Sequence, residues 1–271
     1  MRRISRLPWF IFMVVLALLW LLPLYAMLAN SLKTLREISQ SQYVLPPSGF
    51  ELQNYVTAFE ILRHGLINSV LIAGPATLLA VLLGSWAGFF LARMKFRYAQ
   101  AVFFLATVAT FLPYQIVLIP LIQFLGRLNL MNTRQGLIFA YLILNTPMAA
   151  LITATFFQTV PAEMQEAAAL DGCGPVTFYW RILVPVAQLG ILSTVILIFT
   201  MVWNEFLIAT ALTQGPFSQM ATPVLAGLKG NYAQLWHIQM AGATLTSLPP
   251  LAIFIFLGRY FVSGLMAGTL K

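Results

Sequence analysis

Six long apolar stretches alternate with polar segments along the chain. Each approaches or exceeds the roughly 20 residues that an α-helix needs to cross the hydrocarbon core of a bilayer. The apolar stretches are residues 7–29, 66–91, 99–125, 137–157, 185–210 and 240–257. The pattern therefore predicts an all-α integral membrane protein with six transmembrane helices.

The two longest polar segments follow the first and the fifth predicted spans. Residues 31–64 contain the breaker Pro46-Pro47-Ser48-Gly49, after which apolar side chains recur at helical spacing. These side chains are Leu52, Tyr55, Val56, Phe59 and Leu62. We expect them to form an amphipathic helix on the outer surface, as a structural cap or, alternatively, as a contact for a partner. Residues 214–239 contain Gly215-Pro216 and Pro223, and this segment is expected to be irregular.

Prolines at positions 75, 113, 120 and 147 fall inside the predicted spans. Each removes a helix hydrogen bond and favours a kink. In a helix bundle such kinks usually serve packing. The alternative, a hinge or a cavity, is assigned to Pro113 with Tyr114 and Gln115.

Composition supports the membrane class. The chain has 271 residues, of which 60% are hydrophobic and 8% charged, whereas soluble domains are roughly 25% charged. The formal charge of +8 does not indicate a nucleic-acid partner, because the basic residues do not gather in one stripe. Cys173 is the only cysteine, so an intrachain disulfide is excluded.

The basic residues also predict the orientation in the membrane. If the N-terminus is cytoplasmic, nine basic residues lie inside and six outside. Three of the nine form the short turn Arg93-Met94-Lys95-Phe96-Arg97, and short loops carry the most weight in this rule. The first apolar run is too long for a signal peptide and is expected to be a retained span. We predict that both termini are cytoplasmic.

The polar segment between the fourth and fifth spans has a character of its own. Three of the seven acidic residues, Glu163, Glu166 and Asp171, fall within nine positions. Pro161 suits the start of a helix because its missing N–H costs nothing there, and the alanines that follow Glu166 favour a helix. Gly172 is placed to end it in the left-handed conformation. The segment is predicted to be a helix of about three turns that presents small side chains framed by carboxylates.

This segment resembles the EAA loop of ABC importer permeases. The matching pattern is Glu166-Ala167-Ala168, three residues, Gly172, nine residues, and then Ile182-Leu183-Val184-Pro185. Val184 departs from the leucine that is usual in the pattern. Further features resemble the MalG-like permeases of carbohydrate importers, namely Asp171 before Gly172, Trp203-Asn204-Glu205-Phe206, Gly264-Leu265-Met266-Ala267-Gly268 and Lys271.

The resemblance implies a MetI-like permease fold and a function in carbohydrate import. Residues 1–271 would form one transmembrane domain, with the first span and external loop in residues 1–64, a five-helix core in residues 65–271, and the EAA loop in residues 160–185. The short helix would be the coupling helix that docks on a cytoplasmic ATPase subunit. Its docking residues would be Glu166, Ala167, Ala168, Asp171 and Gly172.

The same resemblance implies the partners and the location. The chain would assemble with a second homologous permease subunit, two ATPase subunits and an extracytoplasmic solute-binding protein, in the cytoplasmic (inner) membrane of a bacterium or archaeon. ATP and magnesium would be bound by the ATPase subunits, and this chain itself would bind no cofactor. The loop of residues 214–239 would face the solute-binding protein.

No motif for catalysis occurs in the sequence. The GxxxxGK[ST] phosphate loop and the HExxH zinc motif are missing, and His64 and His237 are solitary. The chain is therefore not expected to be an enzyme.

Several polar side chains fall within or beside the predicted spans and could either bond other helices or meet substrate hydroxyls. Glu205, near the outer end of the fifth span, could be an interfacial structural residue or could line the external mouth of a pathway. We assign a candidate translocation pathway to Tyr114, Gln115, Asn145, Asn204, Glu205 and Thr244. The remaining polar candidates are Asn68, Thr146 and Thr246.

Two other classes of function remain as alternatives. A secondary transporter would need ion-coupling acids near the middle of the membrane and often internal repeats, and the sequence has neither. A non-transporting structural membrane protein would have no need of a coupling helix. Among substrates, sugars, oligosaccharides, polyols, glycosides and glycerol phosphates all remain open.

Overall fold

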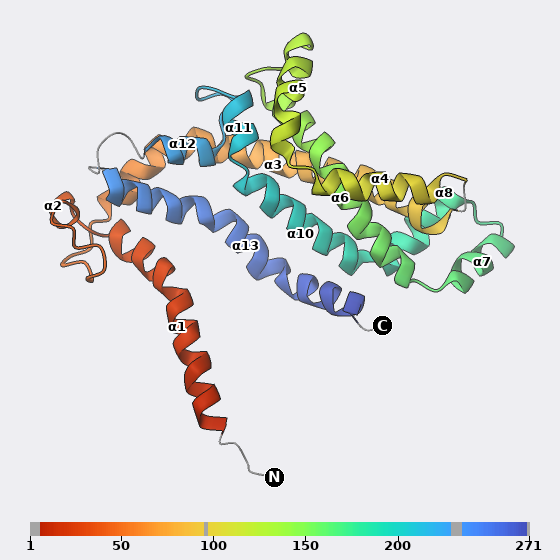
Figure 1. Cartoon of the computed structure of the whole chain (residues 1–271), viewed down its shortest axis with the longest axis horizontal. Coiled ribbons are helices and arrows are strands. Elements are labelled where there is room, and N and C mark those ends of the chain that lie inside the picture. The colour runs from red at the N-terminus through yellow and green to blue at the C-terminus, as the bar shows by residue number, and fades with distance from the viewer. Residues whose placement is uncertain (1–5, 95–96, 229–234, 270–271) are drawn as a thin grey trace. The chain divides into compact units, whose positions relative to one another are not determined.

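A computed structural model describes residues 6–94, 97–228 and 235–269 of the chain (Figure 1). The regular elements in these residues are helices, which confirms the all-α prediction. Arg2, Arg3, Lys95 and Lys271, which the sequence placed on the cytoplasmic side, lie outside the described residues. The helices are α1 (Arg6–Ser31), α2 (Leu35–Ser39), α3 (Gln53–Arg93), α4 (Ala99–Phe111), α5 (Tyr114–Arg127), α6 (Arg134–Thr159), α7 (Ala162–Leu170), α8 (Pro175–Phe178), η1 (Tyr179–Leu183), α9 (Val184–Val186), α10 (Gln188–Asn204), α11 (Leu207–Leu212), α12 (Ala221–Gly227) and α13 (Trp236–Thr269).

The expected membrane spans are found, with two of them broken. Among the described residues, the four helices α1, α3, α6 and α13 are long and apolar enough to cross a bilayer. Two bent helix pairs, α4 with α5 and α8–α9 with α10, raise the number to six if each pair is one span. The chain is therefore a multi-pass membrane protein with four to six spans.

The third predicted span, residues 99–125, is broken into two helices at the proline where a kink was expected. The angle between α4 and α5 is 97°, and Figure 1 shows the two helices running in different directions. Leu112, which precedes Pro113, has ψ 128°, the extended conformation that a following proline favours. The break that was considered for Pro113 therefore exists, and Tyr114 is the first residue of α5.

The fifth predicted span, residues 185–210, has different bounds in the structure. The chain bends by 80° at Ala187, and α10 ends at Asn204. Pro185 has no N–H to continue the helix hydrogen bonds, and the preceding turn is the π-helix η1. Glu205 therefore follows directly after the end of α10 and does not lie on one continuous helix that starts at Pro185.

The amphipathic segment around residues 52–62 is not a separate surface helix, so this expectation is wrong. It forms the first turns of α3, which continues through Gly65. A side-chain Cβ at Gly65 would lie 3.0 Å from the Cα of Ala221, so the glycine permits close packing at that point. Glycine is tolerated within a helix at a modest cost, and here it does not end α3.

The chain folds into two compact units. The first comprises Met1–Arg63 and Val224–Leu248, and the second comprises His64–Pro223 and Pro249–Lys271. Neither unit is one continuous segment, because the chain leaves the first after Arg63 and returns to it at Val224.

The first unit contains a hydrogen-bonded turn between α1 and α3. The ammonium of Lys33 is buried and donates to the side chain of Asn30 and to the carbonyl of Gln42. The amide of Asn54, at the start of α3, donates to the carbonyls of Ser31 and Lys33 at 2.9 and 2.8 Å. These bonds satisfy the polar groups that the turn would otherwise leave unpaired.

Glu37 makes the stability of this turn sensitive to acid. Its carboxylate accepts bonds from the backbone N–H groups of Ser48 and Thr34, both at 2.8 Å, and these bonds lower its pKa to about 2 from the ordinary value of 4.5. A lowered pKa stabilises the fold above pH 4.5, and this contribution is lost as the pH falls from 4.5 towards 2. We expect amide exchange at Ser48, corrected for the intrinsic rate, to accelerate over this range in the wild type. In Glu37→Gln it should already be fast at pH 7 and should not depend on pH. Equal protection in both proteins would contradict this.

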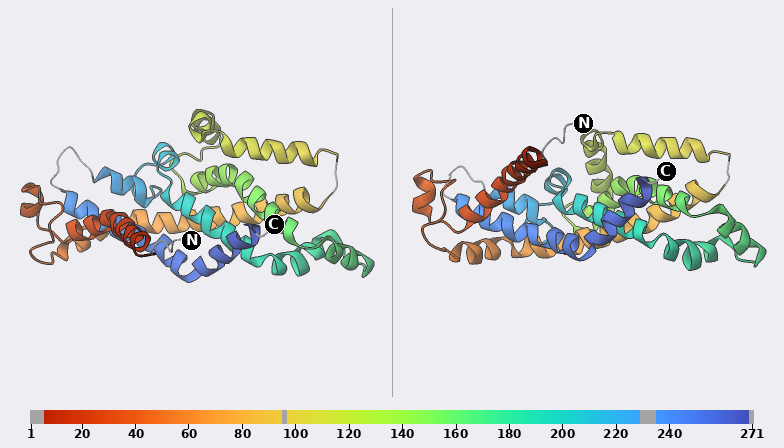
Figure 2. Two further views of the ribbon diagram at one scale, coloured as in Figure 1. Left: turned by 60° about the horizontal axis from the view of Figure 1, so that its bottom comes forward. Right: turned by 90° about the horizontal axis from the view of Figure 1, so that it is seen from below.

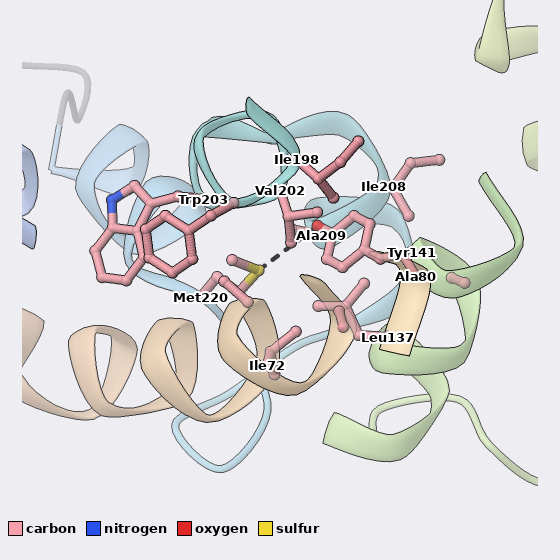
Figure 3. Close-up of a cluster of buried hydrophobic side chains, with 14 of the residues drawn as sticks. Ile72, Ala80, Leu137, Tyr141, Ile198, Val202, Trp203, Ile208, Ala209 and Met220 are labelled. Carbon is pink, nitrogen blue, oxygen red and sulfur yellow. Dashed lines mark hydrogen bonds between the residues drawn. The ribbon is translucent and has the colours of Figure 1, made fainter. Parts of the chain in front are cut away.

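The core of the second unit forms around α6 (Figure 3). Side chains of α3, α6, α10 and α11 pack together there, with Tyr141 of α6 only 1% exposed. The hydroxyl of Tyr141 points towards Met220, with 3.5 Å between the oxygen and the sulfur. Other members of the cluster are Ile72, Leu137, Ile198, Val202, Trp203 and Ile208. Between membrane helices such a core is stabilised by van der Waals packing and not by removal of apolar surface from water.

Helices α3 and α6 approach closely along one line of small residues. A Cβ at Gly84 would lie 2.5 Å from the Cβ of Ala149, and one at Gly88 would lie 2.7 Å from the carbonyl oxygen of Ala150. Two glycines four residues apart are the small-xxx-small spacing that membrane helices use for contact. The two glycines therefore bring α3 against α6.

Candidate functional site

The predicted coupling helix is present as α7. Pro161 is its N-cap, Glu163 lies in its first turn, and Asp171 is its C-cap. Gly172 has φ +78°, its N–H donates to the carbonyl of Ala169 at 3.0 Å, and the next N–H donates to that of Ala168 at 2.9 Å. This pair of bonds is the Schellman termination, so the left-handed glycine stop is confirmed. In both views of Figure 2, α7 lies at one end of its unit.

Helix α7 has one packed face and one bare face. Ala168 is 7% exposed and belongs to a buried cluster with Phe157 and Phe178. The opposite face carries Glu163, Glu166, Ala167 and Leu170, spaced three, four and seven residues from the first and all exposed. Residues at this spacing share one face of a helix. We call these four residues the bare face of α7.

Leu170 is the most informative member of the bare face. Its side chain is 90% exposed, although leucine is normally buried. Together with the carboxylate of Glu166 it gives α7 an acidic and apolar surface that the described part of the chain does not cover. Ala168, by contrast, packs inside its own chain and is not available on this surface. Sequence patterns alone do not distinguish the two.

The base of α7 rests on an aromatic cluster that the sequence did not reveal. The hydroxyl of Tyr179 lies 2.6 Å from that of Ser85, and its ring lies 5.7 Å from Trp86 and 5.5 Å from Phe89, measured between centroids. Tyr179 thus connects the segment after α7 to α3. The one signal in the sequence is the run Gly84-Ser85-Trp86-Ala87-Gly88, whose glycine spacing indicates a helix contact.

Replacing Gly172 tests the termination of α7. A Cβ there would meet nothing within 4 Å, but φ +78° strains any β-branched side chain. We expect Gly172→Val to destabilise the turn by about 1 to 2 kcal/mol and to reduce transport, whereas Gly172→Asn, which tolerates this conformation, retains most of it. Uptake by the two variants in membranes of equal protein content checks this. Equal uptake by Gly172→Val and the wild type would contradict it.

The second unit also contains a cavity of about 610 Å³ beside the break between α4 and α5. Four of the six predicted pathway residues line it: Tyr114, Asn145, Asn204 and Glu205. Gln115 is not among its lining residues, and Thr244 belongs to the first unit. That these residues contact substrate stays a prediction.

Glu205 serves a structural purpose at this cavity. Its carboxylate accepts hydrogen bonds from the N–H groups of Ile208 and Ala209 at 2.9 and 3.0 Å, at the start of α11. It also accepts one from the hydroxyl of Tyr141 at 2.9 Å. A carboxylate at a helix N-terminus is favourable because it satisfies N–H groups that the helix leaves unpaired. Glu205 therefore both caps α11 and faces the cavity.

The lining of the cavity is mostly apolar, with few polar groups. Asn145 and Asn204 each donate from the side-chain amide to the backbone of their own helix, at 2.8 and 2.9 Å. Tyr114 is 42% exposed and presents an aromatic ring. Among the lining residues Glu205 is the one charged side chain. Such a surface suits an uncharged ligand with both apolar and hydroxyl groups.

Asn68 is not a pathway residue in this structure. It is fully buried, and its side-chain oxygen accepts a hydrogen bond from Nε of Arg134 at 2.9 Å. Its amide nitrogen bonds two backbone carbonyls of the segment between α11 and α12, residues 213–220. Interhelical bonding, one of the two roles considered for the polar side chains, is therefore the role of Asn68.

Sequence comparison assigns residues 80–266 to the family described as "Binding-protein-dependent transport system inner membrane component". The glucose import system permease protein GlcU of Saccharolobus solfataricus is 32% identical over 262 residues, which cover 94% of this chain and 91% of that protein. A probable ABC transporter permease protein of Pyrococcus horikoshii is 36% identical over the full length of both.

Structural comparison agrees on the fold. The chain matches a subunit of a bacterial ABC transporter involved in the import of the acidic polysaccharide alginate, with a TM-score of 0.80. The match covers 96% of this chain and 99% of the other, at 16% identity. The likeness therefore concerns the fold, which is that of an ABC importer permease.

Proposed function

Because the chain belongs to the family of inner membrane components of binding-protein-dependent transport systems, we propose that it imports a carbohydrate as one permease subunit of an ATP-driven complex. The complex would contain a second permease subunit, two ATPase subunits and an extracytoplasmic solute-binding protein. The membership of this family excludes the two alternatives, a secondary transporter and a non-transporting membrane protein. The permeases of this family are not themselves catalytic, so ATP and magnesium would be bound by the ATPase subunits.

The bare face of α7 is the observation that carries the proposal. It combines carboxylates with an exposed leucine and is held at the end of its unit by a packed opposite face. A single exposed leucine is common on protein surfaces, but Leu170, which is 90% exposed, shares one face of a short helix with two exposed carboxylates, in the segment that matches the EAA pattern. We assign this face, with Asp171 and Gly172 at its end, to the docking of an ATPase subunit.

A neutral sugar is the substrate class that the cavity supports. Tyr114 offers an aromatic face to the apolar side of a sugar ring, and Asn145 and Asn204, whose amide nitrogens bond their own helices, offer amide oxygens to its hydroxyls. The full-length similarity to a permease of a glucose import system favours the same class. In this proposal substrate passes the break between α4 and α5, while Glu205 keeps the start of α11 in place.

ATP would drive the cycle from outside this chain. Closure of the ATPase subunits would move α7 together with the cluster around Tyr179, since both are packed as one body. The spans would then change from an inward-facing to an outward-facing arrangement. If α4 with α5 is one span, four spans precede α7 and two follow it. Docking on the cytoplasmic side then requires both termini to be cytoplasmic, because an even number of spans separates each of them from α7.

Labelling of single cysteines tests both the orientation and the docking. In a Cys173→Ser background, Leu170→Cys should react with a membrane-impermeant maleimide only in permeabilised cells. It should be protected when the ATPase subunits are co-expressed, because they cover the bare face. The exposed residue Phe217, changed to cysteine, is the matched control and should react in intact cells.

Two results would contradict the proposal. Labelling of Leu170→Cys in intact cells would place α7 outside, where it cannot meet a cytoplasmic ATPase. Labelling in permeabilised cells that is equally fast with and without the ATPase subunits would exclude docking at this face.

A further inference from the structure

The C-terminal end of α3 holds the start of α7. The guanidinium of Arg93, the last residue of α3, donates hydrogen bonds to the carbonyl oxygens of Phe157 and Val160. Both carbonyls lie at the end of α6, and that of Phe157 also accepts a hydrogen bond from the N–H of Val160 at 3.3 Å. Val160 is followed directly by Pro161, the N-cap of α7.

The same stretch of α3 also holds the chain that leaves α7. Ser85 bonds the hydroxyl of Tyr179, and Phe89 packs against the same ring. Entry into α7 and exit from it are therefore both attached to residues 85–93 of α3. A displacement of α7 has to displace this end of α3 or break these contacts.

Further towards its N-terminus, α3 holds the α11–α12 loop, residues 213–220. The amide of Asn68 donates to the carbonyls of Pro216 and Gln219 at 2.9 and 2.8 Å. The hydroxyl of Ser69 accepts a bond from the N–H of Ala221 at 2.9 Å. Two consecutive side chains of α3 thus hold the middle and the C-terminal end of this loop.

In the proposed topology the two attachments lie near opposite sides of the membrane. Asn68 and Arg93 are 25 positions apart on one helix, which corresponds to about 37 Å at 1.5 Å per residue. The hydrocarbon core is only about 30 Å thick. Since α7 is cytoplasmic in the proposed function, the α11–α12 loop lies on the face where the solute-binding protein arrives. The ring of Phe217 in this loop is 80% exposed to a partner there.

We propose that α3 transmits movement between the α11–α12 loop and α7, with Asn68 and Arg93 as the positioning residues at its two ends. The inference rests on the proposed function, in which the partners of the two regions are the solute-binding protein and the ATPase. Pressure of the solute-binding protein on the loop is passed to α3 through Asn68 and reaches α7 through Arg93. Closure of the ATPase acts in the reverse direction, because coupling between two sites is reciprocal.

The complete importer in proteoliposomes provides the test, with ATP hydrolysis measured with and without the sugar-loaded solute-binding protein. Asn68→Asp keeps an acceptor for Arg134 but loses both donors to the loop. Arg93→Lys keeps the charge, but the lysine side chain is one bond shorter than the path to Nη2, the nitrogen that donates to both carbonyls. We expect each to lower the stimulation by the solute-binding protein about tenfold, within the usual range of allosteric coupling. The amount of ATPase that co-purifies should stay at the wild-type level.

Matched variants separate transmission from general damage to α3. Thr77 lies on α3 between the two attachments, and its hydroxyl is buried without a hydrogen-bond partner in the described residues. Thr77→Val should therefore retain full stimulation. Ser69→Ala removes only the acceptor for the N–H of Ala221. It should also lower the stimulation of ATP hydrolysis, and it replaces Asn68→Asp in the test if that variant does not assemble.

The double variant Asn68→Asp with Arg93→Lys decides whether the two residues act along one route. If α3 transmits the signal, breaking it at one end leaves little for the second change to remove, so the double variant resembles either single one. Multiplied losses, or full stimulation in both single variants, would overturn the inference. If no ATPase co-purified with the wild-type chain, the proposed function itself would be overturned.

Discussion

Glu166→Lys should abolish most transport while leaving the protein folded in the membrane. Glu166 is exposed on the bare face of α7 and makes no bond on which the fold of the described chain depends. In the complex its carboxylate would face cationic groups of the ATPase, and a lysine would create a like-charge contact that costs several kcal/mol. A cost of about 3 kcal/mol weakens the affinity for the ATPase by about two orders of magnitude. Co-purification of the ATPase and sugar uptake should fall together.

The control for this variant is Glu60→Lys, which makes the same charge change at an exposed position of α3. It should leave both co-purification and uptake unchanged. If the ATPase co-purified with Glu166→Lys as well as with the wild type, the bare face would not be the docking site, because a reversed charge at the centre of an interface should weaken binding. Glu166 is exposed, so its replacement should not affect folding. Loss of the variant protein from the membrane would contradict this expectation.

Local features of the sequence predicted α7 and its two ends well. The start of α7 at Pro161 and its termination at Gly172 depend on the chemistry of one residue each, a missing N–H and a tolerated positive φ. Apolar runs of sufficient length predicted the four unbroken spans for the same reason, since backbone groups in lipid must be satisfied within the helix. Such signals act over a few residues and can be found in one sequence.

Tertiary contacts could not be predicted in the same way. Four residues grouped as pathway candidates line one cavity, but Asn68, considered among the same polar side chains, binds a loop about 150 positions away. All are polar residues in apolar surroundings, and only the fold determines which carbonyl each one meets. Ala167 and Ala168 differ likewise, since a rotation of 100° along α7 exposes the first and buries the second.

The two breaks in the spans depend on both local sequence and tertiary contacts. Pro113 made a bend foreseeable, because it removes a backbone donor, whereas the bend after Pro185 was not predicted, since a continuous span was expected to start at that residue. The angles of 97° and 80° depend on what the separated halves pack against. The sequence therefore indicated where α4 and α5 separate, whereas the cavity beside that break had to be found in the structure.

Gly88→Leu should have the largest effect on folding of any single change considered for this chain. A Cβ at Gly88 would lie 2.5 Å from Oγ1 of Thr153, 2.7 Å from the carbonyl oxygen of Ala150 and 2.9 Å from the N–H of Ala154. Two of these three atoms belong to the backbone of α6 and cannot move aside as a flexible side chain can. We expect a cost of about 3 kcal/mol or more, at the upper end of the range for overpacked sites. The folded yield in detergent, measured by size-exclusion chromatography after heating, should fall sharply.

Gly74→Leu on the same helix is the matched control, since a Cβ there meets nothing within 4 Å. Removing a glycine from a helix is favourable by roughly 0.5 to 1 kcal/mol where space allows, so this variant should be as stable as the wild type or slightly more so. The opposite results at two glycines of one helix would show that the contact with α6, and not glycine content, stabilises the unit. If Gly88→Leu were as stable as Gly74→Leu, α3 and α6 could not be in close contact, and the attachment of α7 to α3 through Arg93 would lose its support.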